Sequence, residues 1–222
     1  MNGKLIVIEG LDGSGKATQS KLLLEALQRS GKQVMQVSFP DYDSDSSALV
    51  KMYLRGDFGS TPDAVNPYAA SSFYAVDRYA SYMQHWGEFY RAGGIVIADR
   101  YTTSNAIHQC AKLPDAQWDA FLRWLFDYEY TLLGIPAPAH VIYLRVDPEV
   151  SQTLMDERYS GDSSKKDIHE ADLAYLKRTR LAADHCAVRL GWDTVECIRN
   201  NTLRTIEDIA AELRSLTESY DL

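Results

Sequence analysis

The feature that most constrains the fold of this chain is a glycine-rich turn between an apolar run and an amphipathic segment. The run Leu5–Glu9 leads into Gly-Leu-Asp-Gly-Ser-Gly-Lys-Ala-Thr at residues 10–18, and apolar residues then recur with helical spacing at Leu23 and Leu27. A strand that continues through such a turn into a helix directs backbone N–H groups and the positive end of the helix dipole at one point. The spacing therefore predicts a phosphate-binding loop.

The residue types in this loop fit an anionic ligand. Glycines at positions 10, 13 and 15 would let the main chain approach phosphate oxygens, and Lys16 would add a mobile positive charge for the β- and γ-phosphates. A glycine-rich turn can also occur without a ligand. Because this one lies between a buried-looking strand and an amphipathic helix, the pattern favours phosphate binding.

The position that usually supplies a magnesium ligand is altered. Serine or threonine commonly follows the lysine of this motif and holds Mg²⁺, but here Ala17 follows it and Thr18 comes one residue later. A second candidate follows the apolar run Gly94–Ala98, where Asp99 and Arg100 end an expected strand beside the loop. Asp99 would hold Mg²⁺ and Arg100 would bind a phosphate. The alternative is a structural ion pair between these two residues.

Strand-like and helical segments alternate along the whole chain, which predicts an α/β fold. The strand-like segments are short and apolar, and each is followed by a helical pattern. They span Leu5–Glu9, Val34–Phe39, Gly94–Ala98, His140–Val146 and Thr194–Arg199. Strands that are apolar over their whole length suit a parallel sheet covered by helices on both faces, and phosphate sites lie at the carboxyl ends of such strands.

Composition and charge limit the class of protein. The 222 residues, 45% of them apolar, are enough for one substantial core, and no linker-like stretch interrupts them, so we expect a single domain over residues 1–222. The net charge of −8 opposes binding to nucleic acid or to an anionic membrane through long-range repulsion. Small phosphate ligands remain compatible with a local basic pocket.

The cysteines and the start of the chain indicate a compartment. Cys110, Cys186 and Cys197 show no C-x-x-C spacing, so neither a disulfide framework nor a zinc site is expected. An expected strand begins by Lys4, which leaves no room for a signal peptide, and no apolar run approaches the length of a membrane span. These features favour a cytoplasmic protein without a membrane partner.

The long connection at residues 40–93 indicates a second substrate. It far exceeds what a crossover requires, and a helical pattern runs through it at about 67–85. Tyr74 and Arg78 are four residues apart and share one face of this helix. The ring would stack on a base while the guanidinium binds a phosphate or a base carbonyl of the same ligand. The alternative is an aromatic core contact beside a solvated arginine.

Residues at about 158–169 have the composition of a mobile lid. They are polar, contain a glycine and lie between helical patterns. Arg158, Lys165 and Lys166 bracket the lid and would close on a transferring phosphoryl group, although at least one of the lysines is better explained as solvated. Other catalytic classes lack their signatures, because the chain contains no H-E-x-x-H, G-x-S-x-G or N-K-x-D string.

Taken together, these motifs resemble those of the thymidylate kinase family. The similar strings are the loop at 10–18, Phe39-Pro40, Tyr74-x-x-x-Arg78, Asp99-Arg100-Tyr101-x-x-Ser104-Asn105 and Asp167-x-x-Glu170. The resemblance spans nearly the whole chain. It implies a three-layer P-loop NTPase fold with a five-stranded parallel sheet and a mobile lid, transfer of a phosphoryl group from Mg²⁺·ATP to dTMP in dTTP synthesis, and a homodimer.

The resemblance also implies a role for individual residues. Asp12, Lys16, Arg100 and Arg158 would be catalytic. Gly10, Asp12, Gly13, Ser14, Gly15, Lys16, Ala17 and Thr18 would bind ATP. Phe39, Pro40, Tyr74, Arg78, Arg100, Ser104, Asn105 and His108 would bind the acceptor, and Asp99 and Thr18 would hold Mg²⁺.

Several positions depart from the common pattern of the family. Gly13 in the loop and Arg158 at the lid are similar to the lid-type, largely bacterial group, which keeps its catalytic basic residue in the lid. Asp41 stands where many members have a basic residue, and His108 where tyrosine is frequent. Two alternatives therefore stay open: a kinase for another nucleoside monophosphate or a nucleoside, and a catalytically silent nucleotide-binding regulator.

Overall fold

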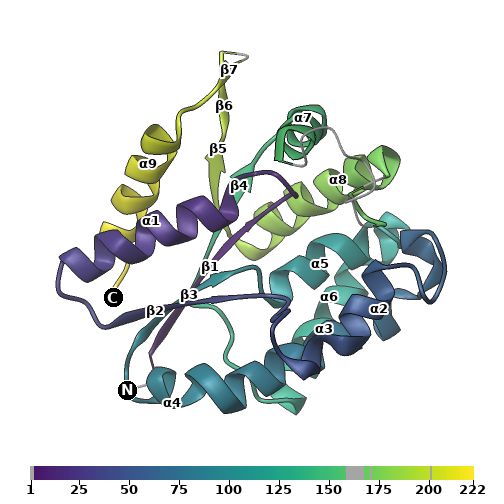
Figure 1. Cartoon of the computed structure of the whole chain (residues 1–222), viewed down its shortest axis with the longest axis horizontal. Coiled ribbons are helices and arrows are strands. Elements are labelled where there is room, and N and C mark those ends of the chain that lie inside the picture. The colour runs from purple at the N-terminus through teal and green to yellow at the C-terminus, as the bar shows by residue number, and fades with distance from the viewer. Residues whose placement is uncertain (1–2, 159–167, 171, 201) are drawn as a thin grey trace.

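A five-stranded parallel sheet forms the central layer of the fold, with strand order β2-β3-β1-β4-β5 (Figure 1). The computed structural model describes residues 3–158, 168–170, 172–200 and 202–222, without the side chains of 156–158. The strands are β1 (Lys4–Gly10), β2 (Val34–Ser38), β3 (Ile95–Asp99), β4 (His140–Arg145) and β5 (Asp193–Glu196). The expected α/β fold and its parallel sheet are confirmed.

The strand ends differ little from those expected from the sequence. The last expected strand, Thr194–Arg199, is divided, because β6 (Ile198–Arg199) leaves the sheet and pairs in antiparallel fashion with β7 (Thr202–Leu203). Cys197 stands between β5 and β6, and its backbone N–H still donates to the carbonyl of Arg145 at 2.9 Å. The apolar periodicity therefore located the segment but not the point where it leaves the sheet.

Helices cover both faces of the sheet, which explains why its strands are apolar throughout. Helices α1 (Lys16–Arg29) and α9 (Ile206–Glu218) pack on one face, where Ile6 and Ile8 of β1 join their apolar residues in a buried cluster (Figure 1). Leu5 and Val7, which alternate with these residues, are buried on the opposite face. Helices α5 (Thr102–Cys110) and α8 (Leu173–Leu190) cover that second face.

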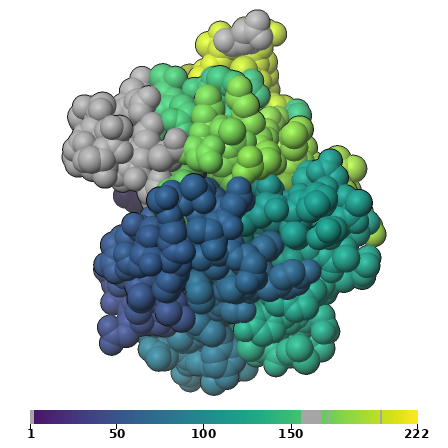
Figure 2. All heavy atoms as spheres, turned by 90° about the vertical axis from the view of Figure 1, so that its right-hand side faces the viewer, coloured from purple at the N-terminus to yellow at the C-terminus, as the bar shows by residue number. Residues whose placement is uncertain are grey.

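The long connection between β2 and β3 is mainly helical. It contains α2 (Ala48–Leu54), α3 (Pro67–Ser81), a π-helical segment Tyr82–Trp86 and α4 (Gly87–Arg91). Asn66 caps α3, since its side chain accepts a hydrogen bond from the N–H of Ala69 at 2.9 Å. In the view of Figure 2 this connection lies next to α8 and α6 (Trp118–Phe126). The predicted helix at 67–85 is therefore present, and its last turn has π geometry.

Helix α7 (Pro148–Arg158) reaches the start of the expected lid, and α9 is the last helix of the chain. Residues 159–167 of the expected lid, with Lys165, Lys166 and Asp167, lie outside the described residues. Thr205 caps the N-terminus of α9, because its hydroxyl accepts a hydrogen bond from the N–H of Asp208. In the part of the chain that the structure describes, no helix is long and apolar enough to cross a membrane.

Candidate active site

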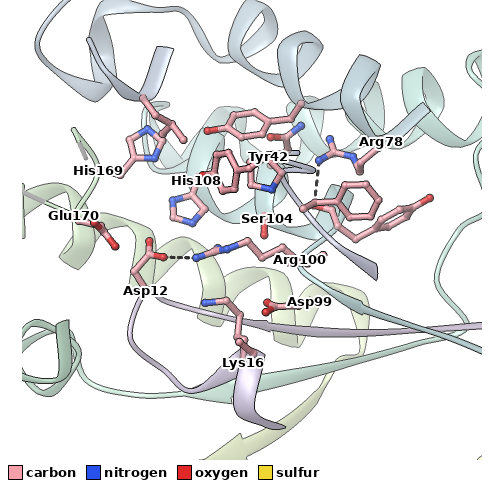
Figure 3. Close-up of a pocket in the computed structure, with 18 of the residues that line it drawn as sticks. Asp12, Lys16, Tyr42, Arg78, Asp99, Arg100, Ser104, His108, His169 and Glu170 are labelled. Atoms are coloured by element: carbon pink, nitrogen blue, oxygen red, sulfur yellow. Dashed lines mark hydrogen bonds and ion pairs between the residues drawn. The ribbon is translucent and has the colours of Figure 1, made fainter. Parts of the chain in front are cut away.

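A cavity of about 820 Å³ opens at the carboxyl edge of the sheet. The β1–α1 loop and the end of β3 form one side, and residues of α2, α3 and α5 form the other. Figure 3 shows Lys16 and Asp99 at one end, Arg78 and His169 at the other, and Arg100 between them. The topology produces this arrangement, because parallel strands β1 and β3 are neighbours and end at the same edge.

Lys16 lies folded over the glycine-rich loop. Its Nζ donates to the backbone carbonyls of Gly10 at 3.0 Å and Leu11 at 2.8 Å, and the side chain is buried. Burial and the nearby charge of Arg100 lower the pKa of Lys16 to about 8. The ammonium group is thus held at the cavity by two carbonyls, which an anionic ligand can replace.

Gly13 has a conformation and a position that exclude a side chain. Its φ is +78°, and a Cβ there would lie 2.8 Å from the carbonyl oxygen of Ser151 in α7. The loop therefore packs directly against α7 at this residue. A basic side chain cannot be carried at position 13 without moving that helix.

Arg100 pairs with two carboxylates, Asp12 and Glu9. Its Nη2 donates to Asp12, and its Nη1 lies 4.0 Å from Oε1 of Glu9. Burial opposes the charged forms, but the pairing outweighs it, so the pKa of Asp12 is held well below its usual range and that of Arg100 is raised. The φ of Arg100 is +67°, an unusual value for a non-glycine residue that often marks functional sites.

Asp99 does not form the ion pair with Arg100 that the sequence left open. Within the described residues its carboxylate has no hydrogen bond or ion pair, although the side chain is only 8% exposed and lines the cavity. Its charge favours the protonated form of nearby Lys16. A buried carboxylate beside a phosphate-binding loop is a fitting ligand for Mg²⁺.

Glu9 is a site residue that the sequence reasoning missed. It is fully buried and accepts hydrogen bonds from the N–H of Gly10 at 2.9 Å and from the hydroxyls of Thr103 and Ser104, each at 2.8 Å. It thereby connects the start of the loop to the first turn of α5 and to Arg100. An acidic residue at the end of an otherwise apolar strand was the available signal.

The second half of the cavity is aromatic. Phe39 is buried with its ring centroid 5.8 Å from that of Tyr101, and it joins Pro40 through a cis peptide bond. Tyr74 lines the cavity, and its ring contacts that of Tyr53 edge to face, with the two ring centroids 6.4 Å apart. Flat apolar side chains at one end of a polar cavity suit a planar base.

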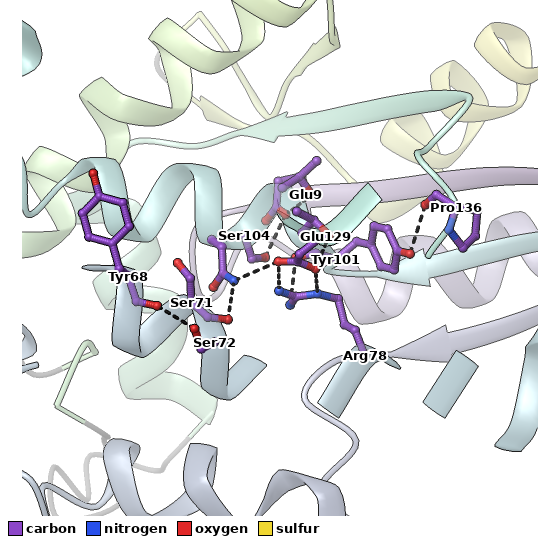
Figure 4. Close-up of polar contacts among 12 residues, drawn as sticks. Glu9, Tyr68, Ser71, Ser72, Arg78, Tyr101, Ser104, Glu129 and Pro136 are labelled. Atoms are coloured by element: carbon purple, nitrogen blue, oxygen red, sulfur yellow. Dashed lines mark hydrogen bonds and ion pairs between the residues drawn. The ribbon is translucent and has the colours of Figure 1, made fainter. Parts of the chain in front are cut away.

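Arg78 is buried and paired, so the alternative of a solvated arginine is wrong. Its Nε and Nη2 donate to the two carboxylate oxygens of Glu129 at 2.7 and 2.6 Å, and the side chain is 2% exposed (Figure 4). Its Nη1 lies 3.4 Å from the carbonyl of Tyr101. Glu129, which the sequence reasoning also missed, belongs to a π-helical segment, Asp127–Leu132, that follows α6.

Two stacked histidines and a glutamine complete the wall. His108 and His169 have ring centroids 5.6 Å apart and nearly parallel planes, and His169 Nε2 and the Tyr53 hydroxyl are hydrogen-bonded at 2.9 Å. Burial and the charge of Arg100 lower the pKa of His108 to about 3, which keeps it neutral. Gln109, unnoticed in the sequence, is fully buried on the cavity wall, and neither amide atom has a hydrogen-bond partner among the described residues.

Comparison with known proteins identifies the family. The thymidylate kinase family model matches residues 8–209. The chain belongs to the thymidylate kinase family. It is 32% identical over 218 residues to the probable thymidylate kinase of Pyrococcus horikoshii, covering 98% of this chain and 97% of that protein. It is 30% identical over 190 residues to the thymidylate kinase of Mycobacterium tuberculosis, covering 85% and 87% of the two chains.

A solved thymidylate kinase has the same fold. The structure from Candida albicans superposes with a TM-score of 0.69 and covers 98% of this chain and 92% of that one, at 21% identity. At this identity the likeness concerns the fold. The P-loop fold expected from the resemblance is confirmed, whereas residues 159–167 of the expected lid lie outside the described residues.

Most residues to which thymidylate kinase resemblance assigns a role lie around the one cavity described above. Those that line it are Asp12, Gly13, Gly15, Lys16, Ala17, Phe39, Pro40, Tyr74, Arg78, Asp99, Arg100, Ser104, Asn105 and His108. Gly10, Ser14 and Thr18 belong to the loop but do not line the cavity, and Thr18 is exposed. The side chain of Arg158 lies outside the described residues.

Proposed function

We propose that this member of the thymidylate kinase family phosphorylates dTMP with ATP, giving dTDP and ADP. An oxygen of the dTMP phosphate attacks the γ-phosphorus of ATP, and the bond from that phosphorus to the oxygen bridging to the β-phosphate breaks. The observation that carries the proposal is a single cavity that joins a phosphate-binding loop to an aromatic pocket. A reaction between two phosphorylated ligands requires this continuity.

The donor phosphates would lie on the glycine-rich loop. Lys16 would exchange its contacts with two loop carbonyls for the β- and γ-phosphates, while the loop N–H groups and the α1 helix dipole favour the anion. The side chains that line the described cavity include five cations and three acids, although the whole chain has a net charge of −8. The cavity lining therefore has an excess of cations, in contrast to the chain as a whole.

The acceptor would occupy the aromatic half of the cavity. Tyr74 would stack on the base, and the amide groups of Asn105 and Gln109 would meet its polar edge. Arg100 would bind the acceptor phosphate, held in place by Asp12 and Glu9. No general base is needed, because a phosphate oxygen is already ionised at neutral pH.

Mg²⁺ and a cation from the lid belong to the same proposal. The residue that fits Mg²⁺ is Asp99, whose carboxylate has no partner among the described residues, whereas Thr18 is exposed and away from the cavity lining. When bound, Mg²⁺ would offset charge on the donor phosphates. Arg158 would act on the transferring group, a role that rests on the family resemblance.

We also propose that the enzyme is a cytoplasmic homodimer. Its α3 and the following π-helical segment expose Tyr68, Val76, Tyr79 and Met83, with Met83 57% exposed. Exposed apolar side chains grouped on one helix are typical of an interface. Such an interface would be formed by the exposed face of the same helix that carries Tyr74 and Arg78.

The test is ADP release with Mg²⁺·ATP and a panel of dTMP, dUMP, dCMP, dGMP, AMP, UMP and thymidine. A strong preference for dTMP supports the proposal. Turnover with another acceptor would keep phosphoryl transfer and reject the base assignment; the thymidylate kinase of Candida albicans has a broad substrate specificity. Nucleotide binding without turnover of any acceptor would favour a silent regulator.

A further inference from the structure

Glu129 is a fully buried carboxylate on which several polar groups converge. It accepts two hydrogen bonds from Arg78, one from the hydroxyl of Thr102 at 2.7 Å and one from Nδ2 of Asn105 at 3.3 Å (Figure 4). The donors come from α3 and α5, and Glu129 itself comes from the π-helical segment after α6. Single π-helical turns are rare in proteins overall, but those that occur are often found at functional sites.

The geometry of the pair determines which part of Arg78 faces the ligand. Glu129 takes the Nε and Nη2 edge of the guanidinium in a bidentate contact, which fixes the plane of the group. Nη1 is left with a long 3.4 Å contact to the Tyr101 carbonyl, and Arg78 lines the cavity. A donor held in one orientation at a cavity wall loses little rotational freedom when a ligand binds.

The pair also determines the charge that the ligand meets. Because the carboxylate of Glu129 is buried against the guanidinium, it balances the positive charge of Arg78 at close range. Arg78 and Glu129 are 2% and 0% exposed, whereas Arg100 and Asp12 are each 18% exposed, so a phosphate would reach and gain less from Arg78 than from Arg100. A carbonyl group of a neutral base accepts a hydrogen bond from it without needing a net positive charge.

We propose that Glu129 is a positioning residue for the acceptor base. It holds Arg78 so that the guanidinium reads a carbonyl of the base, and it ties Asn105 to the same carboxylate. This decides between the two roles that the sequence left open for Arg78, in favour of the carbonyl. The inference rests on the proposed function, since it concerns the acceptor of that reaction.

The first test replaces the carboxylate by its isosteric amide, Glu129→Gln. The KM for dTMP should rise by about tenfold or more, while kcat and the KM for ATP change less than about threefold, because only acceptor binding loses its fixed donor. Equal increases in both KM values, or a lower kcat with an unchanged KM for dTMP, would overturn the proposal.

A control at a half-buried pair with the same hydrogen-bond geometry distinguishes a local effect from the general loss of a bidentate ion pair. Asp184 takes the Nε and Nη2 edge of Arg145 at 3.0 and 3.1 Å in the same bidentate manner, and neither residue lines the cavity. Asp184→Asn should leave the KM for dTMP unchanged. If it raises that KM as much as Glu129→Gln does, the proposal is wrong.

The selectivity between dTMP and dCMP separates positioning from a purely structural role, because general destabilisation of the fold would leave this selectivity unchanged. dCMP presents an amino group where dTMP presents the C4 carbonyl, so a fixed Arg78 donor favours dTMP. In Glu129→Gln the ratio of kcat/KM for dTMP to that for dCMP should fall by about fivefold or more, as the guanidinium gains freedom. An unchanged ratio would contradict the proposed reading of the carbonyl.

A milder variant and a double-mutant cycle complete the test. Thr102→Val removes only one of the hydrogen-bond donors to Glu129, so it should raise the KM for dTMP by less than Glu129→Gln does. In Arg78→Met, the further change Glu129→Gln should have little added effect on kcat/KM, because Glu129 acts through Arg78. Additive effects would show that Glu129 acts in another way. Wild-type turnover on the acceptor panel tests the proposed function separately.

Discussion

At the scale of single residues, the proposal for the donor half of the site depends most on Lys16. It is buried, contacts only backbone carbonyls in the described hydrogen-bond network, and has a pKa lowered to about 8. Its ammonium group is therefore available to a phosphate at little cost to the fold. The loop holds it close to Asp99, whose carboxylate favours the charged form.

Lys16→Ala should reduce phosphoryl transfer to dTMP by about a thousandfold or more, because a cation aimed at charge that develops in the transition state is removed. The free energy of unfolding should change little. Steady-state kcat and urea unfolding measure the two effects. A variant with near-normal kcat would refute the role of Lys16.

His108 should make the fold sensitive to acid. Its pKa is about 3 in the folded protein and ordinarily about 6.5, so between these values the unfolded chain binds more protons. The free energy of unfolding should then fall as pH drops below about 6.5, by up to about 1.4 kcal/mol per pH unit from this residue. Urea unfolding at pH 7.5 and pH 5 measures the change.

His108→Tyr is the matching variant, because it keeps an aromatic ring and removes the titrating group. Its free energy of unfolding should depend less steeply on pH between 7.5 and 5 than that of the wild type. Equal slopes for the two proteins would mean that His108 is not the acid-sensitive group. His169, whose pKa is also well below its usual value because of burial, would still contribute in both.

At the scale of elements, the caps of α3 and α9 provide a matched pair. Asn66→Ala and Thr205→Ala should each lower the free energy of unfolding by about 1 kcal/mol, since each removes one side-chain cap. Only Asn66→Ala should raise the KM for dTMP, because α3 carries Tyr74 and Arg78. Similar KM values in both variants would indicate that the start of α3 does not control the acceptor pocket.

The helices that the sequence predicted are present, while their π-helical turns were not foreseen. The pattern at 67–85 corresponds to α3 and the segment Tyr82–Trp86, and α6 continues into Asp127–Leu132. Apolar periodicity reports which face is buried and is almost unchanged by a single widened turn. The apolar pattern around Glu129 therefore could not predict that its side chain faces Arg78.

At the scale of the whole molecule, the exposed apolar residues of α3 predict self-association. The wild type should sediment as a dimer of the 25.0 kDa chain, and the double variant Val76→Glu and Met83→Glu should sediment as a monomer, because charges would be buried in the interface. Val188→Glu on α8, at an 87% exposed position, is the control and should leave the dimer intact. A monomeric wild type would contradict the interface.

The site was predicted best where its parts are local in sequence. The loop at 10–18, Asp99-Arg100 and Tyr74 with Arg78 are strings whose spacing carries their chemistry, and all three meet at the cavity. The partners of these residues were not predicted. Arg100 pairs with Asp12 and Glu9 rather than with Asp99, and Arg78 pairs with a residue 51 positions away.

The sequence by itself determined the α/β alternation, the phosphate-binding loop and the family, because apolar periodicity and glycine spacing act over a few neighbouring residues. Only the tertiary structure decided the strand order, the absence of room for a side chain at Gly13 and the pairing of Arg78 with Glu129. The physical reason is that these depend on contacts between distant segments. Packing brings such segments together, and burial then favours the pairing of charges such as those of Arg78 and Glu129.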